Sequence, residues 1–439
     1  AMQAGRINIV STAEGAGVRV GPVQVAGREG VQIHSAGDLS ISGQAVPDSL
    51  EVIRAGVRSS QGDVRLHSGK DLTLAAADVS GRDVKLDAGR NLTLSTVESR
   101  RLQETRENWN NSTIGITWET YDRTQTDSDS RQHGSQILAS RDAQLSSAGD
   151  TELKAAKVKA ANNLTVQSGG DLRLSAATES HTQTDQGNHR KHLWKADWNT
   201  SSEEQRSITS HLEGGNIALQ TAALLRSEGA ELSSAADIHL AGKQVEITSA
   251  SRTQRTSDNR YSGDLVGGGF FGKTGDADQG KTQNQGSKIN AAGKLIVKAD
   301  DVRISGSQVR GGTESSVISD KGSLVIDGVQ DTSHTNSHDK DSKFFGITKD
   351  ETRQNAKDSS TVRSELTSDS NLGLKSAKDI EVAGSMVKAG GNLSADAAGD
   401  VKVHSAQDTR DSSTTTETRG FDAYARENSP DAGQYRAGV

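Results

Sequence analysis

Short runs in which apolar and polar residues alternate recur along most of the chain. The clearest example covers residues 62–96, where the runs VRL and LTL (64–66 and 72–74) return as VKL and LTL (84–86 and 92–94). Alternation with a period of two is typical of a strand that buries one face. The triplets Gly-Lys-Asp and Gly-Arg-Asn between the runs favour tight turns, because Gly and Asn adopt positive φ readily.

A repeated unit made only of short strands and turns predicts a stack of coils. One such unit is too small to bury its apolar side, whereas units stacked on one another form a continuous core. A three-sided coil of this length has an interior wide enough for Leu, Val, Ile and Ala. The sequence therefore predicts an all-β fold, a parallel β-helix built as a solenoid of coils of about 20 residues.

Long polar segments interrupt the repeat at regular distances. These excursions cover about residues 98–136, 179–213, 252–287 and 331–370, and residues 408–439 are expected to begin a fifth excursion that is truncated. Their starts are almost evenly spaced along the chain, so roughly two coils separate one excursion from the next. We expect residues 1–61 to form amino-terminal coils or a variant cap, and residues 62–407 to form the repeat β-helix with its excursions.

The excursions contain all 13 aromatic residues of the chain. An interior in which each rung repeats about every 4.8 Å has no room for stacked rings, so the rings are expected outside the coils. Each excursion has two Thr-rich arms around a centre with Gly and an aromatic residue, such as GGGFFG at 267–272 or FFG at 344–346. This arrangement predicts long β-hairpins. Two strands occupy the same height as two coils, so successive hairpins are predicted to pair into one extra sheet.

The composition excludes several classes of function. The chain has no Cys, which excludes disulfides, thiolate metal sites and a Cys nucleophile. Its net charge of −7, with acidic and basic residues interspersed, argues against a surface that binds nucleic acid or an anionic membrane. The chain also lacks a long uninterrupted apolar run, and its first residues have no signal-peptide character, so we expect an internal segment if the protein is exported.

The repeat resembles a known family of exported proteins. The recurring Gly-x-Asp/Asn unit, with YSGDLVGGGFFGKTG at 261–275 and GSKINAAGKL at 286–295, resembles the haemagglutinin repeats of filamentous haemagglutinin-like two-partner secretion exoproteins. The segments DVRISGSQV at 301–309 and DIEVAGSMV at 379–387 are similar to the second repeat class of CdiA-type contact-dependent growth inhibition proteins. The resemblance implies a right-handed parallel β-helix, an outer-membrane two-partner transporter during export, and a place outside a Gram-negative cell or on its surface.

Two functions follow from this resemblance. The leading interpretation is a non-enzymatic extracellular filament segment that presents or delivers a C-terminal toxin to neighbouring bacteria, with the target-cell surface or outer membrane as its partner. The alternative is a filamentous haemagglutinin-like adhesin that binds host or bacterial surfaces. We recognise neither an amino-terminal secretion domain with its Asn-Pro-Asn signatures nor a carboxy-terminal toxin domain, so both interpretations stay open.

A third interpretation is a β-helix polysaccharide lyase or hydrolase that uses the recurring carboxylates as acid and base. These carboxylates recur at the same register in successive coils, as Asp63, Asp71, Asp83, Asp171, Asp237, Asp301, Asp379 and Asp400. A constant register predicts corner residues that accept local backbone hydrogen bonds. An enzyme is expected to interrupt its repeat with one unique cleft, whereas this chain interrupts it periodically. We therefore predict no catalytic residue.

The remaining candidates for ligand chemistry are also explained by structure. The histidines cluster as His181, His189, His192 and His211, and as His334 and His338. Strand or hairpin spacing puts no obvious pair of them on one face, so no metal site is predicted. The glycines at 267–269 lack the Lys-Ser/Thr context of a phosphate-binding loop and are interpreted as a hairpin tip. No cofactor is expected.

The aromatic residues near the excursion centres are the candidate partner-binding residues. Trp, Tyr and Phe bury much area at low entropic cost, which suits a partner-binding or membrane-inserting surface. The favoured alternative is that the rings pack between hairpins or against the coil wall. The candidates are Trp109, Trp118, Trp194, Trp198, Phe270, Phe271, Phe344 and Phe345.

Overall fold

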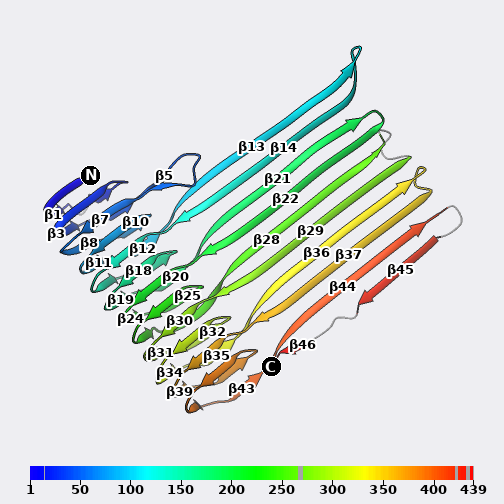
Figure 1. The fold of residues 1–439 in the computed structure, drawn as a ribbon. Helices are drawn as coiled ribbons and strands as arrows, with labels where there is room; N and C mark the ends of the chain where they lie inside the picture. Colours follow the sequence, from blue (N-terminus) through cyan, green and yellow to red (C-terminus); the bar gives the residue numbers. More distant parts are fainter. Residues whose placement is uncertain (14, 265–269, 421–423, 432–435, 439) are drawn as a thin grey trace.

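Stacked coils of three short strands each form a shaft, and long hairpins project from one side of it (Figure 1). The structure is a computed structural model that describes residues 1–439 except 14, 265–269, 421–423, 432–435 and 439, with side chains described up to residue 420. None of the described residues belongs to a helix of the length and hydropathy needed to cross a bilayer. The predicted all-β parallel solenoid is confirmed.

The three sides of the shaft are ladders of parallel strands. The first ladder contains β7 (Ala55–Ser59), β10 (Ala77–Gly81), β15 (Gln136–Ala139), β18 (Lys157–Ala160), β23 (His211–Gly214), β26 (Glu231–Ser234), β30 (Lys288–Ala291), β33 (Gln308–Gly311), β38 (Glu365–Ser368) and β41 (Met386–Ala389). The second contains β8 (Asp63–Ser68), β11 (Val84–Ala88), β16 (Ala143–Ser147), β19 (Asn163–Ser168), β24 (Asn216–Thr221), β27 (Ile238–Ala241), β31 (Leu295–Ala299), β34 (Ser315–Ser319), β39 (Leu372–Ser376) and β42 (Leu393–Ala397).

The third ladder is the one from which the hairpins leave. It contains β2 (Val18–Val20), β4 (Leu39–Ser42), β9 (Leu72–Ala75), β12 (Leu92–Ser95), β17 (Thr151–Lys154), β20 (Leu172–Ser175), β25 (Leu224–Glu228), the start of β28 (Gln244–Asp264), β32 (Asp301–Ser305), β35 (Leu324–Asp327), β40 (Ile380–Ala383) and β43 (Val401–His404). At the amino-terminal end, β1 (Met2–Ser11) pairs with β3 (Gln24–Ser35), and β3 continues into the first two ladders through β7 and β8.

The register between coils explains the sequence period. Val64 lies opposite Val84, and Ala143 lies opposite Leu164, so each of these coils closes within one sequence repeat. Where a hairpin intervenes, the partner lies much farther along the chain, because Val84 lies opposite Ala143. The coil resumes in register after each hairpin, so the same alternate positions keep facing the interior.

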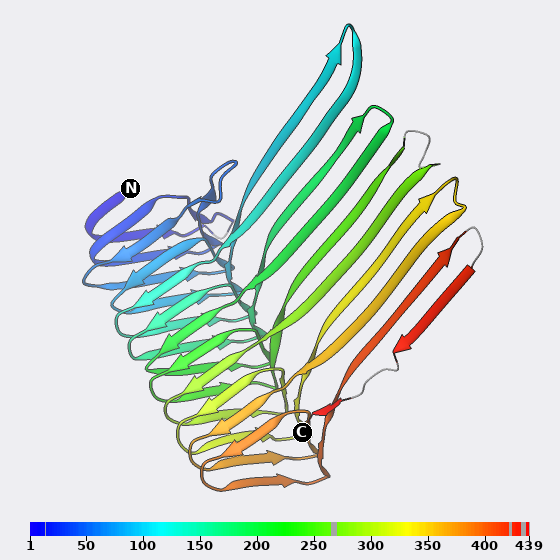
Figure 2. The same cartoon turned by 45° about the vertical axis from the view of Figure 1, so that its right-hand side comes forward.

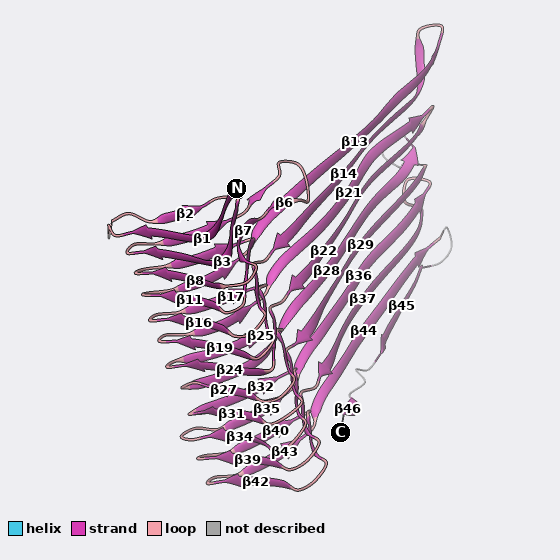
Figure 3. Cartoon of the chain, turned by 60° about the vertical axis from the view of Figure 1, so that its left-hand side comes forward, coloured by secondary structure: helices cyan, strands magenta, loops and turns pink. Residues whose placement is uncertain are grey.

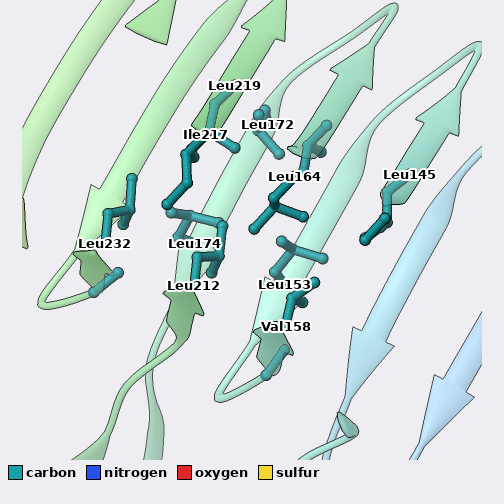
Figure 4. Packing of buried hydrophobic residues seen from close by; sticks show 14 of the residues in the cluster. Leu145, Leu153, Val158, Leu164, Leu172, Leu174, Leu212, Ile217, Leu219 and Leu232 are labelled. Carbon is teal, nitrogen blue, oxygen red and sulfur yellow. The ribbon is translucent and has the colours of Figure 1, made fainter. Parts of the chain in front are cut away.

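Leu, Ile, Val and Ala fill the interior of the shaft, as Figure 4 shows for Leu164, Leu172 and Leu174. These three side chains are fully buried. No aromatic side chain of the described residues lies in this core. The placement agrees with the narrow interior expected for such coils.

The excursions form one antiparallel sheet, which we call the hairpin sheet. Its hairpins are β13 (Val97–Thr113) with β14 (Ile116–His133), β21 (Ala177–Lys191) with β22 (Trp194–Ile208), β28 with β29 (Phe271–Gly286), β36 (Val329–Lys343) with β37 (Thr348–Val362), and β44 (Ala406–Arg419) with β45 (Tyr424–Asp431). Neighbouring hairpins also pair, β14 with β21, β22 with β28, β29 with β36 and β37 with β44. The predicted pairing of successive hairpins is therefore confirmed, and the sheet stands away from the shaft (Figures 2 and 3).

Some strands lie in the shaft where the sequence pattern placed an excursion. β23 and β38 belong to the first ladder, although the excursions were expected to extend to residues 213 and 370. In β38 only Leu366 is apolar, and its neighbours Glu365 and Thr367 point outward, so the strand resembles the polar arms that precede it. Two short strands, β5 (Gln44–Ala45) and β6 (Val52–Ile53), pair in a small hairpin ahead of the first long one, and β46 (Arg436–Gly438) pairs with the base of β44.

Coils alternate between two ways of turning the corner between the third and the first ladder. In one coil the long hairpin takes this corner, and in the next a single residue with left-handed φ does so. These left-handed residues are Ala76 (φ 47), Ala155 (φ 47), Gly229 (φ 62), Gly306 (φ 54) and Gly384 (φ 52). A left-handed conformation costs a non-glycine residue about 1–2 kcal/mol, so the corner is imposed on the two alanines by the surrounding ladders.

Six of the eight recurring carboxylates bind the backbone of the next coil, and the other two, Asp63 and Asp400, pair with basic side chains. The Oδ1 of Asp71 accepts the N–H of Asn91 at 3.2 Å, and the Oδ1 of Asp379 accepts the N–H of Asp400 at 2.8 Å. Asp171, Asp237 and Asp301 each accept a backbone N–H from the following coil in the same way. These contacts support the structural interpretation of the carboxylates over an acid-base one.

Candidate functional site

The outer ends of the hairpins form the surface that distinguishes this molecule from a plain solenoid. We call this surface the distal edge and define it by the described turn residues 113–116, 192–194, 270–271 and 343–348. In Figure 1 it runs along the upper right of the molecule, from the end of β13 and β14 toward that of β44 and β45. The turns follow one another because their hairpins pair side by side.

Two of these turns contain consecutive residues with positive φ. Ile114 and Gly115 both have positive φ, 52° and 74°, and they connect β13 to β14 as a two-residue turn. Phe344, Phe345 and Gly346 also have positive φ, between 52° and 81°. Positive φ at consecutive residues matches the twist of the strands that flank a two-residue turn such as Ile114-Gly115.

Exposure of apolar side chains is concentrated at these turns. Ile114 is 97% exposed, Leu193 76% and Phe345 66%. The other exposed apolar side chains of the same turns are Ile116, Trp194, Phe270, Phe271, Phe344 and Ile347. Large apolar residues gathered on one edge indicate an interaction surface, whereas singly scattered ones need no explanation.

The four candidate phenylalanines form a contact between two hairpin ends. The ring centroids of Phe270 and Phe345 are 4.7 Å apart, and those of Phe271 and Phe344 are 5.8 Å apart. The N–H of Phe344 donates to the carbonyl oxygen of Phe270 at 2.8 Å. All four rings nevertheless remain exposed, so they pack between hairpins and face solvent at once.

Three of the four candidate tryptophans contact other rings, and two of the four, Trp109 at 41% and Trp194 at 46%, are exposed. Trp109 stacks on Tyr121 with centroids 5.3 Å apart, and Trp198 lies 5.9 Å from the same ring while its indole N–H donates to Asp185 at 3.1 Å. Trp118 lies 5.4 Å from His192 of the next hairpin. Trp194 directly follows Leu193 at the turn and is 46% exposed. The structure thus brings Trp109 and Trp198 together through Tyr121 and places Trp194 at the distal edge.

Two carboxylates near the distal edge are buried and surrounded by bases. Hydrogen bonds from Lys349 and His338, the latter at 2.8 Å, lower the pKa of Glu351 to about 2. Hydrogen bonds from Asn111 and His189 lower the pKa of Glu119. Both groups hold neighbouring strands together as ion pairs, which explains charged side chains in covered positions.

The candidate histidines are dispersed over the molecule. Three of them lie beside carboxylates of neighbouring strands. The distance from a ring nitrogen to a carboxylate oxygen is 2.6 Å for His181 and Asp129, 3.3 Å for His211 and Glu231, and 3.4 Å for His334 and Asp278. Within the described ranges no three His, Asp or Glu side chains converge as a metal site would require. The glycines at 267–269, interpreted from the sequence as a tip, lie outside the described residues.

The prediction from sequence named rings and overlooked the aliphatic residues beside them. Ile114, Ile116, Leu193 and Ile347 are exposed members of the distal edge that the aromatic criterion did not select. One signal was available: each is an apolar residue at the centre of a long polar excursion, close to the point where the two arms must reverse. A turn of so few residues exposes whatever side chain it carries.

Comparison with known proteins agrees with the repeat architecture. The family model described as Hemagglutinin repeat matches residues 54–112, 116–196, 193–342 and 345–426. No solved structure matches the chain significantly.

Two curated relatives match nearly the whole chain. A protein named Hemolysin from Proteus mirabilis is 26% identical over 431 residues, which are 92% of this chain and 27% of that protein. A protein named Hemolysin from Serratia marcescens is 28% identical over 470 aligned residues, which cover 100% of this chain and 28% of that protein. The chain therefore spans less than a third of the length of these relatives. It belongs to the Hemagglutinin repeat family of secreted or cell-surface exoproteins.

Proposed function

We propose that this chain is the filament segment of a two-partner-secreted exoprotein that brings a toxic activity to a target cell by direct contact. In this proposal an outer-membrane two-partner transporter exports the protein, the shaft acts as a non-enzymatic spacer, and the distal edge touches the target-cell surface or outer membrane. The observation that carries the proposal is the row of exposed apolar side chains on hairpins that project away from the shaft.

The finer proposal is that the segment presents or delivers a C-terminal toxin to neighbouring bacteria, as in contact-dependent growth inhibition. The resemblance of residues 301–309 and 379–387 to the CdiA-type repeat class supports this version. The named activity of the two relatives supports a second candidate, an exoprotein that lyses target membranes. An adhesin of the filamentous haemagglutinin type would use the same edge for attachment alone.

A co-culture experiment separates these candidates. Donor bacteria display the whole exoprotein, either native or with Ile114, Leu193 and Phe345 replaced by Ser, and surface display is measured by antibody. The proposal expects the native protein to inhibit or lyse recipients only when cells touch, and the substituted protein to be displayed equally but to lose this effect. Attachment of recipients without loss of viability indicates an adhesin, and inhibition that the substitutions leave unchanged contradicts a role for the distal edge.

Red cells and bacteria as parallel recipients distinguish the two toxic versions. Growth inhibition restricted to bacteria supports toxin delivery between neighbours. Release of haemoglobin from red cells supports the lytic version.

A further inference from the structure

We infer that the distal edge inserts its apolar turn residues into the interfacial layer of a lipid bilayer, and that zwitterionic headgroups suffice. The inference rests on the proposed function, because it names the chemistry that the distal edge would meet on the target cell. It commits to lipid as the partner, and a protein or saccharide receptor is an outcome that the experiment below distinguishes.

The residue types at the turns suit the bilayer interface. Aromatic residues are enriched at the level of the headgroups, and aliphatic side chains enter the acyl boundary readily. Ile114, Leu193 and Phe345 are each the most exposed apolar side chain of their hairpin end, and they stand on three different hairpins. Each of these hairpin ends therefore presents its own exposed apolar side chain, which we call a wedge.

The spacing of the wedges favours lipid over a protein partner. Hairpins two strands wide repeat about every 10 Å along the sheet. The polar Lys195 pairs with Gly263 between the second and third hairpins, whereas Phe270 and Phe345 join the third turn to the fourth. A stable protein interface needs about 1,600 Å² of continuous, complementary surface with a packed centre. A bilayer accepts an uneven row of apolar side chains without a matching shape, so the turns can insert into it whether or not they contact one another.

Several bases at the edge already have acidic partners within the protein. Lys191 lies 3.3 Å from Glu119, and Lys273 lies 3.4 Å from Asp341. Lys349 pairs with Glu351 in the same way. Bases that already have acidic partners add little attraction for anionic lipid, so the expected driving force is apolar.

The hairpin arms limit the depth of insertion. Below the turns, β13, β14, β36 and β37 carry Thr, Ser, Asn, Asp and Lys on both faces. Burying these polar and charged side chains in hydrocarbon would be unfavourable. Insertion is therefore confined to the last turn of each hairpin, which leaves the shaft in water above the bilayer.

Vesicle binding tests the inference directly. The whole chain is sedimented with phosphatidylcholine vesicles and with vesicles containing phosphatidylserine, and brominated lipids report contact through quenching of tryptophan fluorescence. We expect similar binding to both vesicle types, quenching that Trp194→Phe reduces, and about tenfold weaker binding for each of Ile114→Ser and Leu193→Ser. The matched controls are Leu102→Ser and Leu138→Ser, since both side chains are exposed away from the turns and are expected to leave binding unchanged.

Three results overturn the inference: binding that requires phosphatidylserine, binding that the control substitutions weaken equally, and no vesicle binding by a chain that still binds recipient cells. The last result leaves the proposed function standing with a protein or saccharide receptor. Vesicle binding without any toxic effect in co-culture supports lipid contact and contradicts the proposed function. Circular dichroism and thermal unfolding of each variant exclude loss of the fold as the cause.

Discussion

The shaft and the hairpin sheet are both made of β-strands, yet they are stabilised in different ways. The shaft has a continuous apolar core in which side chains such as Leu72, Leu94 and Leu219 are fully buried. The hairpin sheet has no comparable core among the described residues, and its strands are Thr, Ser, Asn and charged residues joined by long antiparallel pairing. One region is stabilised mainly by burial, and the other mainly by backbone pairing and cross-strand contacts.

The comparison also shows why the two regions can coexist. Two strands of an antiparallel sheet and two coils of a solenoid both rise about 9.6 Å, so hairpins that leave after every second coil meet their neighbours without strain. The period of the core thus sets the spacing of the sheet. The sheet can then vary its turn residues without disturbing the shaft.

A core substitution is expected to show the largest difference between the regions. Leu72→Ala removes a fully buried side chain from the third ladder and is expected to lower the free energy of unfolding by about 2–5 kcal/mol. Leu102→Ala, at a 59% exposed position on β13, is expected to change it by less than about 0.5 kcal/mol. Urea unfolding followed by circular dichroism measures both, and equal losses would contradict the division into core and coreless regions.

A corner substitution compares a constrained turn with an open one. In Gly306→Ala the new Cβ would lie 2.4 Å from Cγ2 of Val329 in a residue of φ +54°, so a loss of about 2–3 kcal/mol is expected. In Gly115→Ala, at φ +74°, no atom lies within 4 Å of the new Cβ. The expected loss of stability at this position is only the cost of a left-handed backbone for Ala, about 1 kcal/mol. Thermal unfolding compares the two variants, and a larger effect at Gly115 would contradict the account of the corner.

Acidification is expected to loosen the hairpin formed by β36 and β37. The pKa of Glu351 in the folded protein, about 2, lies below its ordinary value of 4.5, because Lys349, His338 and Arg353 stabilise the carboxylate. This contribution to stability is complete above about pH 4.5 and is lost as the pH falls toward 2. Hydrogen exchange of the amides in β36 and β37 measures the effect. Glu351→Gln is expected to remove this group's share of the pH dependence, whereas Glu365→Gln, on the shaft, serves as the control.

Removal of the first hairpin is expected to have the smallest effect on the shaft. Ser95 lies opposite Ala75 of the preceding coil, and Gln136 lies opposite Asp78. Replacing residues 96–134 with a single Gly therefore puts that Gly at the position of Ala76 and reproduces its corner. This hairpin pairs with only one neighbour, β21, among the described strands of the sheet, so its loss leaves the rest of the sheet intact. The thermal midpoint of the remaining shaft is expected to stay within about 4 °C. A large decrease would show that the shaft depends on the sheet.

The sequence pattern predicted the scaffold well because each coil repeats the same local chemistry. Alternation in residues 62–96 marked the strands, and the constant register of residues such as Asp71 and Asp379 identified them as corner residues. The end of the fourth hairpin was harder to place, because β38 contains a single inward apolar residue, Leu366. A strand with so little pattern is recognised only from its neighbours in the ladder.

The candidate surface was predicted less completely. Aromatic residues were the criterion, so Phe345 and Trp194 were found and Ile114 and Leu193 were not. Ring contacts such as Phe270 with Phe345 join hairpins that are far apart in the sequence, and no local pattern encodes that contact. Whether a ring packs or faces solvent depends on which hairpin lies beside it.

By itself the sequence determined the all-β solenoid, its period, the approximate starts of its excursions and the exclusion of rings from its core. These properties follow from side-chain volume and from alternation along single strands, both of which are local. Only the tertiary structure decided that Ala76 and Ala155 adopt left-handed corners, that Glu119 and Glu351 become buried ion pairs, and that Ile114, Leu193 and Phe345 share one exposed edge. Those properties depend on contacts between coils and hairpins far apart in the chain, and such contacts exist only after the ladders have stacked.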